Sequence, residues 1–438
     1  MPDIGAYMVV LAVVALTTFA SLFVVRRVAV RVGAVVRPDE RRVHTRPTPT
    51  LGGVGMLVGV LAGMLAAWLL GDFAEVFRGS TEPFGLMLAA VIMLAVGVVD
   101  DMREVSAPAK LAGMVLPASV LVISGIAIIV LRVPFLGVFV LSSDWSYLLS
   151  VIWVVGMANA INLIDGLDGL AAGIVAIASG TFFLYALQLG DEGILQAGNI
   201  GPLVAVLVLG ACLGFLPHNV HPAKIFMGDG GSLLLGLLLA ASTMVVGGRT
   251  DQAFSGQSFF FFAPILIPLV ILGVPVIDTL FAIIRRTTKR SGITAADKGH
   301  LHHRLMRLGH GQWRSVLILW AWTALLSGFV LYPTYTGSGD AIVPIGIAAI
   351  LLALYTVLHP GIRVRRRSAG GVEVDLGPAA DDPLDDEVDP GDEPPAPDAP
   401  SVVGPFAHRP MQPPPVLMPP PSPPPPPAPP RGTEGQPR

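Results

Sequence analysis

The sequence predicts an all-α membrane protein that crosses a bilayer many times. Hydrophobic residues make up 53% of the 438-residue chain and charged residues only 13%, which is about half the charge of an ordinary soluble domain. The mean hydropathy is +0.69, and long apolar runs alternate with short polar segments. The single cysteine, Cys212, excludes an intrachain disulfide and a metal centre with several cysteine ligands. We therefore expect a polytopic protein.

About eleven apolar runs are long enough, or nearly so, to span the hydrocarbon layer of a membrane. None of them has Lys or Arg in its interior. The join between the fifth and sixth runs is the least regular, because Asn159, Asn162, Asp165 and Asp168 interrupt it. In chain order the runs are 5–25, 51–70, 84–99, 111–131, 145–164, 169–189, 199–216, 232–248, 259–284, 315–332 and 341–358.

The basic residues orient these runs. The first run follows Asp3, has no Lys or Arg before it and is followed by a pair of arginines. This is the reverse of a signal peptide, so we expect an uncleaved anchor with its amino end outside. Most Lys and Arg residues then fall in cytoplasmic loops, as the positive-inside rule requires, and eleven spans leave the carboxyl terminus in the cytoplasm. The exterior loops hold only Arg78, Arg132 and Arg249.

A change in composition near residue 361 predicts two parts. Residues 1–360 hold all the apolar runs and form the transmembrane domain. Residues 361–438 begin with arginines, continue through an acidic stretch and end in proline runs such as Pro424–Pro427. They offer little apolar surface to offset the entropy of ordering, so we expect a disordered cytoplasmic tail with polyproline II character. A solvated tail is favoured over a partner-binding segment.

Acidic residues gather at the ends of apolar runs, and the predicted topology places them all on the cytoplasmic side. Adjacent carboxylates are costly to ionise together without a cation, and oxygen ligands suit Mg²⁺. The pattern therefore indicates a site for Mg²⁺ and phosphate, although a hydrophilic end of a span explains the Asp100–Asp101 pair alone equally well. The acids are Asp100, Asp101, Asp165, Asp168 and Asp229.

Two motifs supply most of these acids. In the segment from Asn159 to Gly169 polar residues recur every three positions, so on a helix they would share one face. A hydrogen-bonded seam between helices is the alternative, and the acid spacing is not that of an EF-hand. In Phe226-Met-Gly-Asp229-Gly-Gly-Ser232 the glycines permit close backbone approach. Free N–H groups at the start of the following helix would suit a phosphate, although glycine-rich joins between spans are also common.

The most basic loop contains His300-Leu-His302-His303-Arg304. Histidines there would suit a diphosphate clamp and a proton donor at neutral pH, and a positive-inside cluster with incidental histidines is the alternative. The carboxylate-rich surroundings favour Mg²⁺ or Mn²⁺ over Zn²⁺. His44-Thr-Arg46-Pro-Thr-Pro-Thr50-Leu-Gly-Gly53 predicts a proline-stiffened loop that leads into a glycine-rich helix start.

In this order the motifs resemble those of the polyprenyl-phosphate N-acetylhexosamine-1-phosphate transferases, the membrane superfamily that includes phospho-MurNAc-pentapeptide translocase. The resemblance extends from about Arg37 to Leu308 and excludes the tail. Five separated motifs in the same order on a polytopic chain make it specific. The motifs are His44…Gly53, Asp100-Asp101, Asn159…Gly169, Phe226…Asp229 and His300…Leu305.

The resemblance implies transfer of GlcNAc-1-phosphate from UDP-GlcNAc to undecaprenyl or decaprenyl phosphate with release of UMP, the first membrane step of a cell-envelope polysaccharide. It implies Mg²⁺ or Mn²⁺ bound by Asp229, Asp100 and Asp101. The same three residues, with His302 and His303, would be catalytic. The implied substrate-binding residues are Arg46, Asn162, Asp165, Gly166, Asp168, Asn219, Phe226 and His300.

The details favour the GlcNAc-1-phosphate branch of this superfamily. The pentapeptide translocase usually has three consecutive histidines and a Lys near position 46, whereas this chain has Leu301 between histidines and Arg46. MurNAc-pentapeptide transfer is the alternative within the class. A secondary transporter is the alternative from another class, but transporter sites usually lie near the bilayer midplane.

We expect the protein in the bacterial plasma membrane with a cytoplasmic active site. Its expected partners are UDP-GlcNAc and polyprenyl phosphate in the inner leaflet. A homodimer is compatible with the sequence, and no nucleic acid is expected.

Overall fold

The computed structural model describes residues 1–36, 47–103, 105–133, 137–196, 198–247, 310–337 and 342–358, with the single positions 273, 305, 306 and 340. Helices dominate these ranges, and eight of the helices described are long and apolar enough to cross a membrane. The protein is therefore a polytopic membrane protein, as predicted. Apart from position 273, the apolar run 259–284 lies outside the described residues, as do residues 300–304 of the histidine motif and the tail 361–438.

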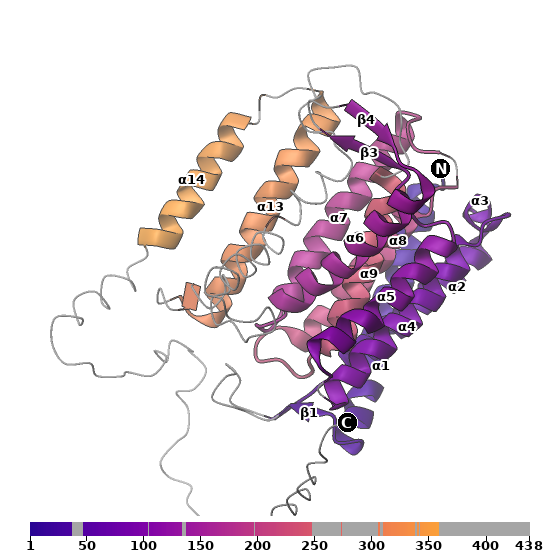
Figure 1. Cartoon of the computed structure of the whole chain (residues 1–438). Coiled ribbons are helices and arrows are strands. Elements are labelled where there is room, and N and C mark those ends of the chain that lie inside the picture. The colour runs from indigo at the N-terminus through magenta and orange to yellow at the C-terminus, as the bar shows by residue number, and fades with distance from the viewer. Residues whose placement is uncertain are drawn as a thin grey trace, which may run out of the picture. The chain divides into compact units, whose positions relative to one another are not determined.

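Helices α1 to α9 pack into one bundle, and α13 contacts this bundle through α7 (Figure 1). The helices are α1 (Ile4–Arg31), α2 (Gly52–Leu70), α3 (Ala74–Phe77), α4 (Glu82–Arg103), α5 (Ala107–Ile123), α6 (Ser143–Ile164), α7 (Leu170–Asp191), α8 (Gly201–Asn219), α9 (Gly228–Gly247), α13 (Gln312–Thr336) and α14 (Ile342–Leu358).

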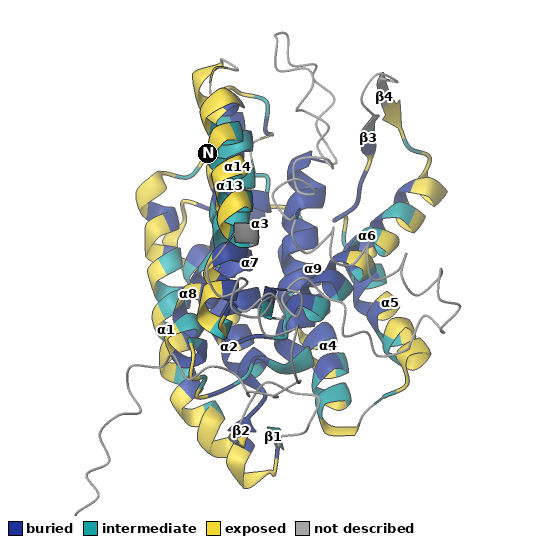
Figure 2. Cartoon of the chain, turned by 90° about the vertical axis from the view of Figure 1, so that its left-hand side faces the viewer, coloured by how far each residue is buried: buried dark blue, intermediate teal, exposed yellow. Residues whose placement is uncertain are grey.

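Helix α9 is the centre of the bundle. It contacts α2, α4, α6, α7 and α8. Every residue of its most apolar 18-residue segment is buried inside the protein, whereas only 22% of the residues in the most apolar 18-residue segment of α1 are buried. Figure 2 shows the difference, with α9 coloured as buried and much of α1 as exposed. An exposed apolar helix face suits lipid, and a helix that is apolar all round suits the interior. The amino-terminal end of α9, which begins with Gly228 and Asp229, is therefore fixed by its neighbours.

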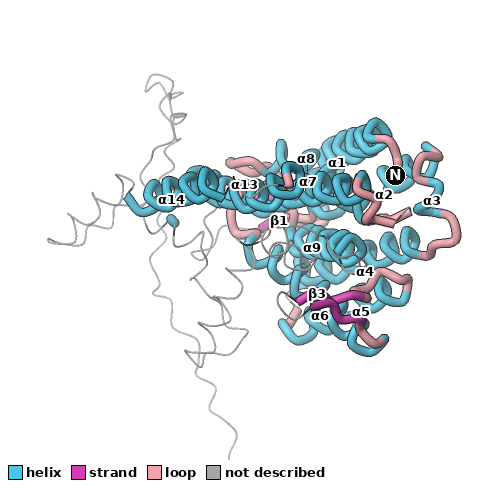
Figure 3. The backbone as a smooth tube through the Cα atoms, turned by 90° about the horizontal axis from the view of Figure 1, so that it is seen from above, coloured by secondary structure: helices cyan, strands magenta, loops and turns pink. Residues whose placement is uncertain are grey.

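Two short antiparallel strand pairs correct the all-α prediction. Strand β1 (Val35–Val36) pairs with β2 (Thr48–Pro49), and β3 (Val130–Val133) pairs with β4 (Gly137–Val140). The apolar run 111–131 was predicted as one span, but α5 ends at Ile123 and the chain turns at Gly125, whose φ is +103°. The β-branched residues after this turn favour a strand, and Figure 3, a view from above, shows the strand pair over α5 and α6.

Glycines allow α9 to approach two neighbouring helices closely. A Cβ at Gly97 of α4 would overlap the backbone of Gly230, and a Cβ at Gly53 of α2 would overlap the backbone of Gly231. Small residues at such crossings let helix backbones touch in membrane proteins. These contacts bring the start of α2, the end of α4 and the start of α9 to one end of the bundle. Each of these helix ends carries one of the motifs described above.

The contact between α4 and α9 predicts that Gly97→Ala is destabilising. Forcing a side chain between two packed backbones costs about 1–3 kcal/mol, so the thermal unfolding midpoint of the purified protein in detergent should fall. Gly156→Ala on α6 is the matched control, because a Cβ there meets nothing within 4 Å and Ala favours a helix over Gly. Equal midpoints for the two variants would contradict the close approach of α4 and α9.

Candidate active site

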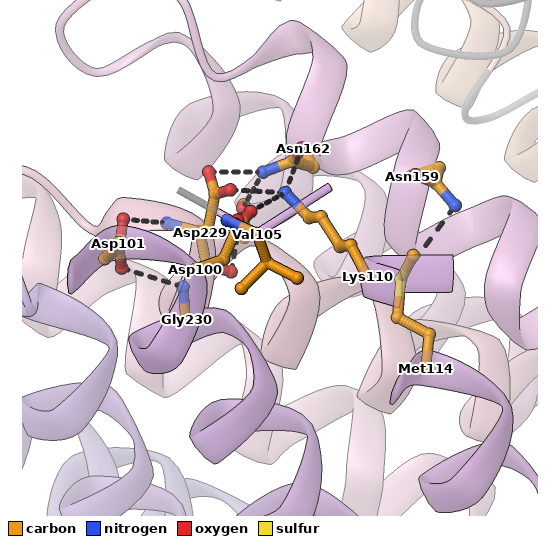
Figure 4. A network of polar contacts seen from close by, with 10 residues as sticks. Asp100, Asp101, Val105, Lys110, Met114, Asn159, Asn162, Asp229 and Gly230 are labelled. Carbon is orange, nitrogen blue, oxygen red and sulfur yellow. Dashed lines mark hydrogen bonds and ion pairs between the residues drawn. The ribbon is translucent and has the colours of Figure 1, made fainter. Parts of the chain in front are cut away.

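Four helices bring polar side chains together at one end of the bundle (Figure 4). Asp100 lies near the end of α4, Lys110 near the start of α5, Asn162 near the end of α6 and Asp229 at the start of α9. We call these four residues the polar cluster. Each comes from a helix end, and α9 contacts both α4 and α6 while α5 contacts the same two helices.

The ammonium group of Lys110 lies at the centre of the polar cluster. Its Nζ is 2.7 Å from Asp100 Oδ2 and donates to Asp229 Oδ2 and, at 3.3 Å, to Asn162 Oδ1. The side chains of Lys110 and Asp100 are only 14% and 12% exposed, and that of Asp229 is 33% exposed. A charge-assisted contact in such a sheltered site is stronger than the same pair in water.

Asn162 fixes the orientation of Asp229. Its amide nitrogen donates to Asp229 Oδ1 at 2.8 Å and to Ser232 Oγ at 2.9 Å. One carboxylate oxygen of Asp229 therefore faces Asn162 and the other faces Lys110. Asp100 is held in a similar way, because its Oδ1 accepts a hydrogen bond from the backbone N–H of Val105 at 2.8 Å.

Asp101 faces a different partner from Asp100. Its two carboxylate oxygens accept hydrogen bonds from the backbone N–H groups of Asp229 at 2.9 Å and Gly230 at 3.2 Å. Asp101 thus satisfies donors at the start of α9, where a negative charge also complements the helix dipole. The predicted use of these N–H groups for a phosphate is wrong at Asp229 and Gly230, because Asp101 already accepts from both.

The segment after α6 does not continue the helix face that the three-residue spacing predicted. Helix α6 ends at Ile164, and Asp165, Gly166 and Asp168 lie in the connection to α7. Gly169 has a φ of +74°, a conformation that glycine adopts without strain. The connection turns the chain, so Asp165 and Asp168 lie beyond the helix that carries Asn162.

The end of α8 and the connection from α8 to α9 brace the connection from α6 to α7. Asn219, which is buried, accepts from the backbone N–H of Gly169 at 2.9 Å and donates to the carbonyl of Ile225 at 3.0 Å. Buried Asp168 accepts from the backbone N–H of Ala223 at 3.1 Å and pairs with His221 Nδ1 at 2.8 Å. The candidate substrate-binding residues of 165–169 and of 219–226 therefore belong to one cross-linked unit.

Phe226 joins this unit to the start of α2. Its backbone N–H donates to the carbonyl of Pro49 at 2.9 Å, and its carbonyl accepts from the N–H of Gly52 at 2.9 Å. The next residue repeats the pattern, since Met227 accepts from Gly53 at 3.0 Å. The proline-containing entry to α2 is thus held against the segment that leads into α9.

The environment of Asp165 favours its protonated form. Burial and then the carboxylates of Asp229, Asp101 and Asp168 raise the pKa of Asp165 to about 8. Desolvation disfavours the charged form, and nearby negative charges act in the same direction. Carboxylates are therefore concentrated at this end of the bundle, and a cation there would be stabilised by their charge.

Comparisons with known proteins decide the family. The glycosyl transferase family 4 model matches residues 83–247, a range that contains the whole polar cluster. The decaprenyl-phosphate N-acetylglucosaminephosphotransferase of Mycolicibacterium smegmatis is 38% identical over 358 residues, which are 80% of this chain and 87% of that protein. The chain belongs to glycosyl transferase family 4.

Other relatives agree with this membership. The probable undecaprenyl-phosphate N-acetylglucosaminyl 1-phosphate transferase of Bacillus subtilis is 39% identical over 70% of this chain and 78% of its own length. The phospho-N-acetylmuramoyl-pentapeptide-transferase of Geobacillus kaustophilus is 32% identical over 68% of this chain and 88% of its own length. The resemblance inferred from the motifs is thus confirmed. Because these relatives are named as transferases, the protein is an enzyme.

The polar cluster has the donor chemistry that a divalent cation requires. Among the described residues no group of three or more His, Cys, Asp and Glu side chains converges as a metal site. Lys110 nevertheless contacts oxygens of Asp100, Asp229 and Asn162, and two carboxylates with an amide oxygen are hard donors of the kind Mg²⁺ and Mn²⁺ bind. The residues present fit such an ion at the place that the ammonium group takes.

Two residues of this site were missed by the sequence motifs. Lys110 lies directly before the apolar run 111–131, and a lysine at the start of such a run is a usable signal. His221 lies in no motif of the sequence, and nothing in the sequence pairs it with Asp168. The predicted site residues Arg46, His300, His302 and His303 lie outside the described residues.

The cap on α9 predicts that Asp101→Ala lowers the stability of the protein. Loss of a carboxylate cap at a helix start costs about 0.5–2 kcal/mol, so the thermal unfolding midpoint should fall. Asp72→Ala, at an exposed position, is the control and should leave the midpoint unchanged. An Asp101→Ala variant as stable as the control would contradict the capping role.

The raised pKa of Asp165 predicts a pH-dependent stability. The folded protein keeps this proton up to about pH 8, whereas the unfolded chain releases it near the ordinary value of 3.8. The stability that the proton contributes is complete below 3.8 and is lost as the pH rises through 8. In EDTA, the thermal midpoint of the wild type should therefore fall more steeply than that of Asp165→Asn as the pH rises from 3.8 to about 8, the range over which only the folded protein holds this proton. Parallel curves would contradict the assignment.

Proposed function

We propose that this protein transfers GlcNAc-1-phosphate from UDP-GlcNAc to polyprenyl phosphate and releases UMP. The observation that carries the proposal is the polar cluster at the start of the central helix of a family 4 chain. Carboxylate, amide and ammonium groups from four helices meet there, which suits a reaction between anionic phosphates that depends on charge neutralisation.

The relatives support this choice of sugar. Those named for N-acetylglucosamine phosphate transfer are 38% identical over 80% of this chain and 39% identical over 70% of it, whereas the pentapeptide transferase is 32% identical over 68%. The interrupted histidine motif and Arg46 favour the same branch. MurNAc-pentapeptide transfer is the alternative that an experiment must exclude.

The position of the polar cluster suits a reaction between a lipid and a water-soluble nucleotide. Polyprenyl phosphate keeps its chain in the membrane and its phosphate at the surface, while UDP-GlcNAc stays in water. The polar cluster lies at the ends of apolar helices, where both substrates can meet. The distribution of Lys and Arg supports a cytoplasmic location for this end.

Asp229, Asp100 and Asn162 would hold the divalent ion, Mg²⁺ or Mn²⁺. When bound, the ion neutralises the diphosphate and the charge that develops on departing UMP. Asp101 would act through Asp229, because it holds the backbone of that residue. Asn162 would keep the Asp229 carboxylate aimed at the ion, since it donates to Oδ1 and leaves Oδ2 facing the centre of the cluster.

The connections after α6 and α8 would bind the uridine part of the nucleotide. Asp165, Gly166, Asp168, Asn219 and Phe226 lie on these cross-braced segments, and a braced pocket loses little entropy when it binds a ligand. Arg46 would lie near the same pocket, and His300, His302 and His303 would face the diphosphate. The lipid phosphate would then attack the β-phosphorus of UDP-GlcNAc in line with the bond to UMP. Direct attack and a route through a covalent carboxylate intermediate are both consistent with these residues.

The proposed reaction predicts that the purified protein releases UMP from UDP-GlcNAc only when polyprenyl phosphate and Mg²⁺ are both present. Asp229→Asn should lower this rate by about 100-fold or more, as losses of preorganised electrostatic groups typically do. Asp144→Asn, at an exposed position near the start of α6, is the matched control and should keep the wild-type rate.

Two outcomes would overturn the proposal. UMP release from UDP-MurNAc-pentapeptide but not from UDP-GlcNAc would favour the alternative transferase. Full turnover by Asp229→Asn at limiting Mg²⁺ would exclude the polar cluster as the reaction centre.

A further inference from the structure

We propose that Lys110 is an exchangeable counter-ion, which occupies the divalent-cation position in the free enzyme and moves to the substrate phosphates when the metal ion binds. The inference deepens the proposed function and rests on it, because it assigns a second role to the same site. The exchange of Lys110 for the metal ion can be measured by metal binding alone, without the transfer reaction.

The first observation is that the contacts of Lys110 match its bonding capacity. A lysine ammonium group has three N–H donors and no acceptor, and Nζ contacts three oxygens, those of Asp100, Asp229 and Asn162. These oxygens come from three different helices. The ammonium group therefore occupies the point at which the donor oxygens of the polar cluster converge.

The second observation is that Lys110 is poorly placed to serve its own helix. It lies in the first turn of α5, and its backbone N–H donates to the carbonyl of Ser106 at 2.9 Å. A positive charge near a helix amino terminus opposes the helix dipole. The acidic neighbours of α4 and α9 account for the cation at this position, and the needs of α5 do not.

A divalent ion that binds all three oxygens must take the place of the ammonium group, because the oxygens converge on one point. Mg²⁺ binds oxygen at about 2.0–2.1 Å and requires near-octahedral geometry, while Lys110 Nζ already lies 2.7 Å from Asp100 Oδ2. Two cations on the same carboxylate oxygens repel each other strongly in a sheltered site. Binding of the metal ion must therefore release Lys110.

The rest of the polar cluster is held independently of Lys110. Asn162 donates to Asp229, Val105 donates to Asp100, and Asp101 fixes the start of α9. The cation site thus keeps its shape while its occupant changes. The released side chain is long and flexible, and its charge remains beside the bound ion, where the phosphates of both substrates must come.

The exchange predicts opposite effects of Lys110→Met on metal binding and on catalysis. In the purified full-length protein without nucleotide, Mn²⁺ titrated by electron paramagnetic resonance should bind Lys110→Met about fivefold or more tightly than wild type, the lower end of typical coupling between linked ligands. At saturating Mn²⁺ the same variant should release UMP at least about tenfold more slowly, because the phosphates lose a cation. Lys224→Met, which removes an exposed lysine from the connection before α9, is the matched control and should leave Mn²⁺ affinity unchanged.

A second measurement uses the wild-type protein, so it does not depend on how a variant folds. Mn²⁺ should increase the rate at which an amine-reactive reagent modifies Lys110, as followed by mass spectrometry, and should leave the rate at Lys224 unchanged. Unchanged or weaker Mn²⁺ binding by Lys110→Met, or no change in Lys110 modification, would overturn the inference. Exchange without UMP release by the wild type would instead overturn the proposed function and leave the exchange intact.

Discussion

The hydrogen bonds between the end of α4 and the start of α9 are the constraint on which the site depends. Asp101 accepts from the N–H groups of Asp229 and Gly230, and Gly97 lets the two backbones approach one turn earlier on α4. Asp100 is next to Asp101 in the chain, and Asp229 is itself one of the donors, so the carboxylates of Asp100 and Asp229 are brought together whenever this junction forms. The junction thus converts helix packing into a fixed arrangement of charge.

That arrangement concentrates negative charge at the edge of an apolar bundle, and its balance governs the chemistry. Lys110 neutralises part of the charge and Asn162 directs Asp229, while burial and then the nearby carboxylates raise the pKa of Asp165. Such a site stabilises a cation, and through the cation it can bind phosphates that the carboxylates alone would repel. The same features that make the polar cluster costly to build make it suited to phosphoryl transfer.

The sequence predicted which residues matter better than how they are used. Asp100 and Asp229 could be predicted because each borders an apolar run, and Asn162 because polar residues recur every three positions near the end of the run 145–164. A common membrane face for them follows from the predicted topology. The separate roles of Asp100 and Asp101 could not, because adjacent residues on a helix point in different directions and only the position of α9 decides which of them meets its N–H groups.

The fold shows the same division. The apolar runs predicted helices at 5–25, 51–70 and 84–99, and α1, α2 and α4 cover these ranges. Hydropathy cannot distinguish an apolar helix from an apolar strand, so 111–131 was predicted as one span although it includes the turn at Gly125 and the start of β3. Polar spacing likewise could not show that α6 ends at Ile164, because the connection that follows is held at Gly169 by Asn219 from a distant segment.

The position of Mn²⁺ in a crystal of the full-length protein, located by anomalous scattering, would show directly whether the polar cluster binds the metal ion in place of Lys110. We expect one strong peak in contact with carboxylate oxygens of Asp229 and Asp100, with the Lys110 ammonium group moved away from both. A peak on other residues, or an ion at Asp229 with Lys110 still between the two carboxylates, would contradict this expectation.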